Sequence, residues 1–125
     1  MVSLDATNKS IVYQNEIEDI CSIKSRISDV VRELLDFNAN FRKKSEGLEG
    51  AIIHDALAVA AVIEPDVIQK ENYYVAIETE GKLTYGRTVI DMNRVTGNPP
   101  NAEVSLGLNR ERFIEMLKEM MRAYN

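Results

Sequence analysis

Residues 51–63 read AIIHDALAVAAVI, a run that is apolar on nearly every side except at His54 and Asp55. A surface helix carries polar residues along one face, so this pattern predicts a helix buried on most of its sides. Glu64-Pro65 ends or interrupts that helix, because the residue before a proline avoids the helical backbone conformation. We therefore expect a buried helix near the middle of the chain, with a polar pair at its entrance.

Upstream of this run, apolar residues recur at steps of three and four, which is the spacing of one helical face. They are Ile17, Ile20, Cys21, Ile27, Val30, Val31, Leu34, Leu35 and Phe37. The spacing predicts helix, broken near Ser22 to Ser28. Residues 38–50 are polar and hold two glycines, which favours a loop or a frayed helix end. Residues 2–7 and 11–13 are expected to be short extended pieces, joined by a turn at residues 8–10.

Downstream, the pattern changes from helical to strand periodicity. Residues 73–79 and 83–91 are rich in Val, Ile, Thr and Tyr and flank Glu80-Gly81. A glycine turn between two such stretches predicts a β-hairpin. The Thr96 to Pro100 turn then separates the hairpin from the rest of the chain.

The last part of the chain predicts one more strand and a closing helix. Residues 102–108 place Val104, Leu106 and Leu108 on one side, as a half-buried strand does. Asn109 is a typical N-cap for the helix that follows. The apolar stripe of this helix comprises Phe113, Ile114, Leu117, Met120, Met121 and Tyr124.

The composition indicates a single globular unit over residues 1–125. The chain has 45% hydrophobic and 28% charged residues, and no repeat or linker divides it. Its net charge of −5 disfavours binding to nucleic acid or anionic lipid. Cys21 is the single cysteine, which excludes an internal disulfide framework and fits a reducing, cytoplasmic setting. The run Ala56 to Ile63 is far shorter than the roughly 20 residues that span a bilayer, and MVSLDATNKS lacks a signal-peptide pattern.

His54 and Asp55 form the one pair of residues that stands out chemically. A carboxylate in the first turn of a helix is favoured by the free backbone amides, so Asp55 is explained as a cap or first-turn anion. A hydrogen-bonded, partly buried imidazole likewise explains His54. The functional alternative is an acid and a metal ligand held side by side on a rigid element. The residues alone leave both explanations open.

The other polar residues give weaker indications. Asp5, Asp66 and Asp91 each lie near the end of an expected element and are interpreted as solvated turn residues. No Gly-x-Ser-x-Gly, Walker or dinucleotide-binding glycine motif is present, so serine hydrolase, P-loop and dinucleotide functions have no local support. Met120-Met121 and Tyr73-Tyr74 are expected to serve packing.

Four collinear pieces of the sequence resemble the inosine-uridine nucleoside hydrolases, which cleave the N-glycosidic bond of ribonucleosides. Residues 50–60 (GAIIHDALAVA) resemble the family's His-Asp helix. Residues 4–7 (LDAT) are similar to its Leu-Asp-Val-Thr segment, and residues 86–91 (GRTVID) to its Gly-x-Thr-Val-x-Asp strand. Residues 96–104 (TGNPPNAEV) resemble its Gly-x-Pro-Pro-Asn-x-x-Val turn and strand. Residues 109–113 then resemble the start of its closing helix.

The resemblance implies a fold and a site. The expected fold is α/β: the C-terminal part of the nucleoside hydrolase fold, with helices packed on a small sheet, a β-hairpin and a C-terminal helix. His54 matches the family histidine that lies beside the nucleobase and is proposed to protonate the leaving group. Asp55 matches an aspartate of the family's calcium site, so Ca²⁺ is the implied cofactor. An acid of near-neutral pKa assists departure of a base that gains negative charge.

The resemblance also implies missing parts. The family's aspartate-rich Asp-x-Asp-x-x-x-Asp-Asp motif and the segment that holds the ribose hydroxyls have no counterpart in this sequence. We expect a ribonucleoside substrate, with either self-association or pairing with a missing N-terminal half. The alternative is a non-catalytic remnant or oligomerisation module of the family. A neighbouring reading frame that encodes the aspartate-rich half would favour the enzyme.

Overall fold

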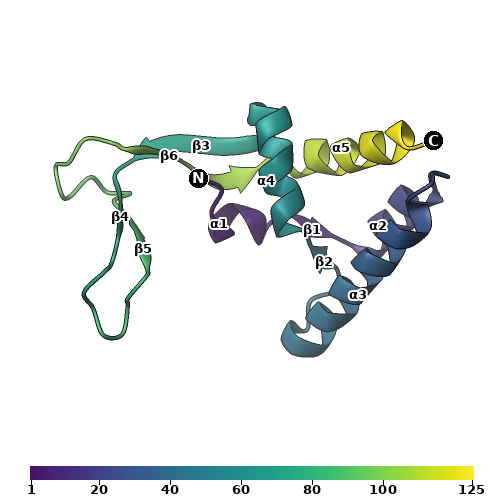
Figure 1. Ribbon diagram of the computed structural model, residues 1–125, viewed down its shortest axis with the longest axis horizontal. Coiled ribbons are helices and arrows are strands. Elements are labelled where there is room, and N and C mark those ends of the chain that lie inside the picture. The colour runs from purple at the N-terminus through teal and green to yellow at the C-terminus, as the bar shows by residue number, and fades with distance from the viewer.

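The computed structural model describes residues 1–125 as an elongated arrangement with α4 near its centre (Figure 1). The helices are α1 (Leu4–Thr7), α2 (Gln14–Ser22), α3 (Ser28–Glu46), α4 (His54–Ile63), the short 3₁₀ helix η1 (Pro65–Val67) and α5 (Arg110–Ala123). The strands are β1 (Ile11–Val12), β2 (Ala51–Ile52), β3 (Ile68–Tyr73), β4 (Val75–Ile77), β5 (Thr88–Ile90) and β6 (Ala102–Leu108). The predicted mixture of helices, small sheets, hairpin and closing helix is confirmed.

The strands form three separate antiparallel pairs, β1–β2, β3–β6 and β4–β5. The β3–β6 pair is the longest and carries a register shift between Gln69 and Lys70. In Figure 1 this pair runs to the left of α4 and carries the β4–β5 hairpin at its far end, while α2 and α3 lie at the lower right. The hairpin and the α2–α3 pair therefore lie at opposite ends of the molecule.

Two apolar clusters hold the helices together. One joins α2, α3, α5 and the β1–β2 pair, and its members are Val12, Ile17, Ile20, Cys21, Leu35, Ala39, Ala51, Ile114 and Met121. The other joins α4, η1 and α5 through Leu57, Ala60, Val67 and Phe113. Cys21 is one of these buried side chains, and burial raises the pKa of its thiol. Helix α5 belongs to both clusters and therefore couples the two ends of the core.

The N-terminal third differs from its prediction at two places. Residues 4–7 form α1 and not a strand, because the carbonyl of Ser3 accepts hydrogen bonds from the amides of Ala6 and Thr7. Only Val2 keeps an extended contact, as a parallel bridge to Ser105. The predicted break after Ser22 is confirmed, but α3 continues as regular helix to Glu46, through most of the stretch expected to be a loop or a frayed helix end.

The central helix begins later and is less buried than its sequence predicts. Ala51 and Ile52 form β2, so α4 starts at His54. Leu57 and Ala60 are buried, whereas the exposed fractions of Val59, Val62 and Ile63 are 59%, 82% and 72%. The prediction of a helix buried on most sides is therefore wrong for this chain, because no part of residues 1–125 covers the face of α4 that carries Val59, Val62 and Ile63. No helix is both long and apolar enough to cross a membrane.

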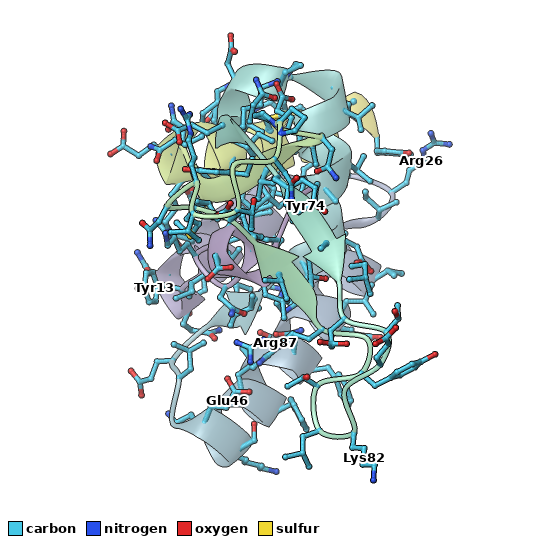
Figure 2. All side chains as sticks on the ribbon, turned by 90° about the vertical axis from the view of Figure 1, so that its left-hand side faces the viewer. Tyr13, Arg26, Glu46, Tyr74, Lys82 and Arg87 are labelled. Atoms are coloured by element: carbon cyan, nitrogen blue, oxygen red, sulfur yellow. The ribbon has the colours of Figure 1, made fainter.

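The hairpin has a longer connection than the turn predicted at Glu80-Gly81. Strands β4 and β5 pair Val75 with Ile90, and residues 78–87 form the loop between them. The Glu78 carboxylate accepts hydrogen bonds from the amides of Glu80 and Gly81, so it organises the loop from its base. Those contacts turn the chain before Thr79 can continue the strand. Figure 2 shows Lys82 at the tip of this loop.

The C-terminal elements agree with the prediction. Strand β6 spans Ala102–Leu108, and α5 follows directly. The Asn109 side chain accepts a hydrogen bond from the Arg112 amide, so it is the N-cap. Phe113 and Met121 are buried, but Tyr124 lies beyond the helix and is 45% exposed.

Candidate active site

The position of His54 is set by the β1–β2 pair that precedes it. Ile52 pairs with Ile11, and the Ile53 amide donates to the Ser10 carbonyl. The Ser10 hydroxyl donates back to the Ile53 carbonyl at 3.0 Å. Gly50 permits this pairing, because a Cβ atom there would lie 2.8 Å from the Val12 carbonyl oxygen. The entrance of α4 is thus fixed to the N-terminal segment.

Both ring nitrogens of His54 have hydrogen-bond partners. Nδ1 lies 2.8 Å from Oγ1 of Thr7, which is buried in α1. Nε2 lies 3.1 Å from a terminal nitrogen of Arg42, which projects from the end of α3. The ring is partly buried and joins segments that are far apart in the sequence.

Asp55 lies beside His54 but in a different environment. It occupies the first turn of α4 and is exposed to solvent. No group of three or more acidic, histidine or cysteine side chains that could hold a metal ion is present. Ca²⁺ takes about 6 to 8 oxygen ligands, so the residues of this chain do not form a calcium site by themselves.

Asp91 is not the solvated turn residue that the sequence suggested. It is buried, and it accepts hydrogen bonds from the amides of Val95 and Thr96 and from the Thr96 hydroxyl. The Thr96 hydrogen bonds hold the pKa of this carboxyl below its ordinary value. Its role is to close the turn after β5. Asp5 and Asp66, in contrast, are exposed near element ends as predicted.

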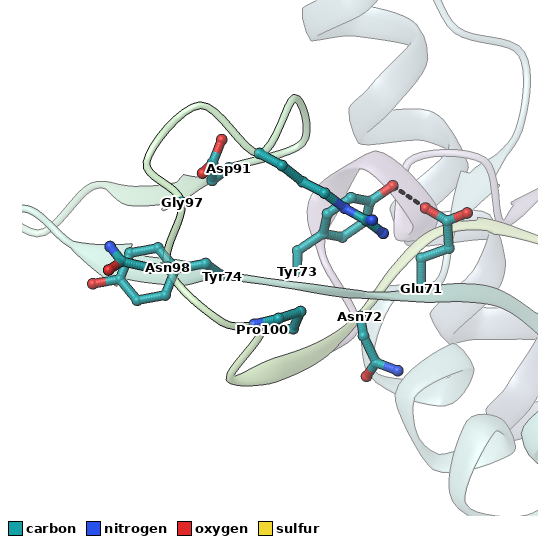
Figure 3. Close-up of a pocket in the computed structure, with 9 residues that line it drawn as sticks. Glu71, Asn72, Tyr73, Tyr74, Asp91, Gly97, Asn98 and Pro100 are labelled. Carbon is teal, nitrogen blue, oxygen red and sulfur yellow. Dashed lines mark hydrogen bonds between the residues drawn. The ribbon is translucent and has the colours of Figure 1, made fainter.

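His54 and Asp55 line none of the main surface cavities, although the flanking residues Ile53 and Ala56 line a small apolar one. A polar cavity of about 480 Å³ lies beside the end of β3 and the turn after β5 (Figure 3). In it the Tyr73 hydroxyl donates to the Glu71 carboxylate, which raises the pKa of Tyr73. His54 therefore has fixed hydrogen-bond partners but does not line any of these cavities.

Two residues of the His54 environment were not singled out by the sequence. Thr7 lies in the LDAT segment, but nothing in that segment indicates that its hydroxyl faces a histidine. Arg42 lies in a stretch expected to be loop. The Asn38 side chain accepts a hydrogen bond from the Ile52 amide. Arg42 follows Asn38 by four residues, and only this helical spacing would have placed Arg42 on the face that meets β2 and α4.

Comparison with solved structures defines the class of the fold as that of nucleoside hydrolases. A purine-preferring ribonucleoside hydrolase from Gardnerella vaginalis superimposes with a TM-score of 0.81 at 22% identity, over 99% of this chain and 39% of that structure. The plant nucleoside hydrolase PpNRh1 superimposes with a TM-score of 0.80 at 20% identity, over 96% of this chain and 40% of that structure. The shared fold includes the central His54 helix.

Sequence comparison then gives the family. Residues 1–115 match the family described as inosine-uridine preferring nucleoside hydrolase, and the chain belongs to this family. The pyrimidine-specific ribonucleoside hydrolase RihA of Salmonella schwarzengrund is 37% identical over 125 residues. RihA of Salmonella typhimurium has the same identity. The chain spans about 40% of the length of these curated relatives.

Proposed function

We propose that this chain supplies the nucleobase side of a ribonucleoside hydrolase site, as a single unit over residues 1–125. The reaction is attack of water on the ribose carbon of the N-glycosidic bond, which yields ribose and free base. His54 carries the proton that the departing base accepts. The observation that supports this role is the position of His54, fixed at the first residue of α4 by the β1–β2 pair and by two side-chain hydrogen bonds.

Asp55 is proposed to give one carboxylate ligand to Ca²⁺. Its exposure and its place beside His54 leave its oxygens free to meet ligands from outside this chain. A bound Ca²⁺ orients and activates the attacking water in such sites. Because this chain offers no further acidic cluster, we expect residues 1–125 alone to bind Ca²⁺ weakly.

The remaining walls of the site are proposed to come from the rest of a nucleoside hydrolase domain. Along α3, four large apolar side chains are more than half exposed on one stripe, at spacings of four and three residues: Val30, Leu34, Phe37 and Phe41. Val62 and Ile63 add an exposed apolar face on α4. A cavity of about 190 Å³ with only apolar lining opens beside Leu34. Surfaces of this kind mark interaction sites, and the relatives contain a further 60% of chain length that could cover them.

The relatives of this chain differ in their base preference. Among the proteins that resemble this chain, RihA is named for pyrimidines and the Gardnerella vaginalis enzyme for purines. The proposed substrate is therefore a ribonucleoside. The single buried cysteine and the relatives that act on nucleosides support a cytoplasmic reaction.

The test is release of free ribose from uridine, cytidine and inosine in the presence of Ca²⁺. This chain is combined with a polypeptide comprising the portion of RihA that it does not match, and formation of a folded complex is verified by sedimentation. Ribose release that His54→Ala lowers at least 100-fold is expected, since general acid catalysis contributes about 10²–10⁴-fold. Ser45→Ala, at an exposed position on α3, is the control.

The alternative, a non-catalytic association module, is favoured by the same exposed apolar stripe. It predicts a folded complex that releases no ribose. Leu34→Glu tests the stripe itself, because a charge in its middle prevents burial, whereas Glu33→Lys changes the charge at a neighbouring exposed residue that is not on the stripe. If Leu34→Glu prevents formation of the complex and Glu33→Lys does not, the apolar stripe is the docking face, whether or not the complex is catalytic.

A further inference from the structure

Arg42 is held against His54 more closely than an ordinary surface arginine would be. Its side chain is only 20% exposed, and one terminal nitrogen lies 3.1 Å from Nε2 of His54. The other terminal nitrogen pairs with Glu46 at 2.6 Å. Figure 2 shows Glu46 on the α3 end that carries this pair. The Nε atom of Arg42 is buried and has no hydrogen-bond partner.

This arrangement determines where the His54 proton lies. A guanidinium group has donors and no acceptor, so Nε2 must accept the hydrogen bond from Arg42. A neutral imidazole then carries its proton on Nδ1, where the Thr7 hydroxyl accepts it. We propose that Arg42 is a positioning residue that holds His54 as the Nδ1–H tautomer and occupies Nε2. Arg42 contacts no reacting atom in this role; it acts through His54.

The partial pairing of Arg42 suggests how Nε2 becomes free. A buried donor without a partner is unfavourable, so an acceptor brought beside Arg42 would draw the guanidinium toward itself. Nε2 then loses its donor and can take up a proton from solvent, and the resulting imidazolium keeps its Nδ1–H bond to Thr7 and donates the Nε2 proton to the leaving base. This consequence rests on the proposed hydrolase function, whereas the tautomer itself does not.

An ordinary helical ion pair with Glu46 does not account for the geometry. Pairs at positions i and i+4 form between exposed side chains and need no third residue. Here the same guanidinium also reaches across to another helix, and Asn38, one turn earlier on α3, is bonded to the Ile52 amide. The α3 face that carries Asn38 and Arg42 is therefore fixed against the entrance of α4.

The test is the ¹⁵N NMR spectrum of the imidazole ring in the 125-residue chain, with no substrate or metal present. His54 is the single histidine, so its two ring nitrogens are the only imidazole signals. At pH 9, where imidazole is neutral, the expected spectrum shows a protonated Nδ1 and an unprotonated Nε2. Arg42→Met is expected to shift the proton toward Nε2, and Arg42→Lys, which keeps a cationic donor, to retain the wild-type pattern.

Glu46→Gln is the matched control, since it removes the ion pair but leaves Arg42 in place. The His54 tautomer should not change in this variant. The backbone amide spectrum of each variant verifies that the chain is folded. A wild-type ring protonated on Nε2 would overturn the proposal without any variant, and so would an unchanged tautomer in folded Arg42→Met. Neither result bears on whether a completed site hydrolyses nucleosides, so this test and the ribose assay fail separately.

Discussion

Replacing Gly50 by alanine should disrupt the entrance of α4 more than its small size suggests. The added Cβ would lie 2.8 Å from both the Val12 carbonyl oxygen and Cγ2 of Ile11. Overpacking costs about 1–3 kcal/mol. Because one of the two atoms is backbone in a two-residue strand, we expect the upper part of this range, about 2–3 kcal/mol. For a chain of this size, that loss lowers Tm by about 10 °C.

Gly47 provides the matched comparison three residues earlier. Its φ is +68°, and a Cβ there would meet nothing within 4 Å. Gly47→Ala therefore costs only the left-handed backbone conformation, about 1 kcal/mol, partly offset by lower entropy of the unfolded chain. Urea unfolding followed by circular dichroism measures both variants, and the His54 ring signals report the local change. The reasoning is refuted if Gly50→Ala is no less stable than Gly47→Ala, or if its His54 signals are unchanged.

Three further predictions concern the parts of the fold around the site. Leu57 is fully buried, so Leu57→Ala should lower the free energy of unfolding by about 3 kcal/mol. Val62 is 82% exposed, so Val62→Ala should change it by less than about 0.5 kcal/mol. Equal losses in urea unfolding would contradict the assigned burial. Asn109→Ala should cost about 1 kcal/mol through loss of the α5 cap, and Asn109→Asp should restore it in the same measurement. Because the pKa of Asp91 is lowered, its contribution to the free energy of unfolding is fully present above the ordinary value of 3.8 and disappears as pH falls through the lower folded-state value. The stability difference between wild type and Thr96→Val should therefore shrink in thermal melts from pH 6 to pH 2. A difference that grows on acidification would contradict this role of Asp91.

Elements whose stability is local were predictable from the sequence. The Asn109 cap and the apolar stripe that begins at Phe113 define α5 without reference to other segments. The break after Ser22 is also a local feature, because Ser28 bonds back to the Ile23 carbonyl and the Ser25 amide. These signals lie within a few residues of the structure that they determine.

Features that depend on distant partners could not be predicted in the same way. Residues 2–7 were predicted to be extended, but Val2 alone makes an extended contact, with Ser105 near the other end of the chain. The apolar pattern of α4 reports burial on both sides, and this chain supplies only one of the two covering layers. Val62 is exposed for that reason and not because the pattern is ambiguous.

The candidate site shows the same division. His54 and Asp55 were found because two polar residues interrupt an apolar run. Thr7 and Arg42 were missed because 47 and 12 residues separate them from His54, and only the folded chain brings them together. The apolar pattern located the helix and the resemblance to the family gave His54 and Asp55 their expected roles, whereas the hydrogen bonds at the entrance of the helix come from the structure alone.

Two substrates that differ in their need for an acid test the role of His54 in the completed complex. Uridine needs a proton on its leaving base, whereas p-nitrophenyl riboside releases a stabilised phenolate that needs none. If His54 is the acid, His54→Ala lowers kcat/KM for uridine by at least about 100-fold and leaves that for p-nitrophenyl riboside within a few-fold of wild type. Equal losses on both substrates, or no loss on uridine, would contradict the assignment of His54 as the acid.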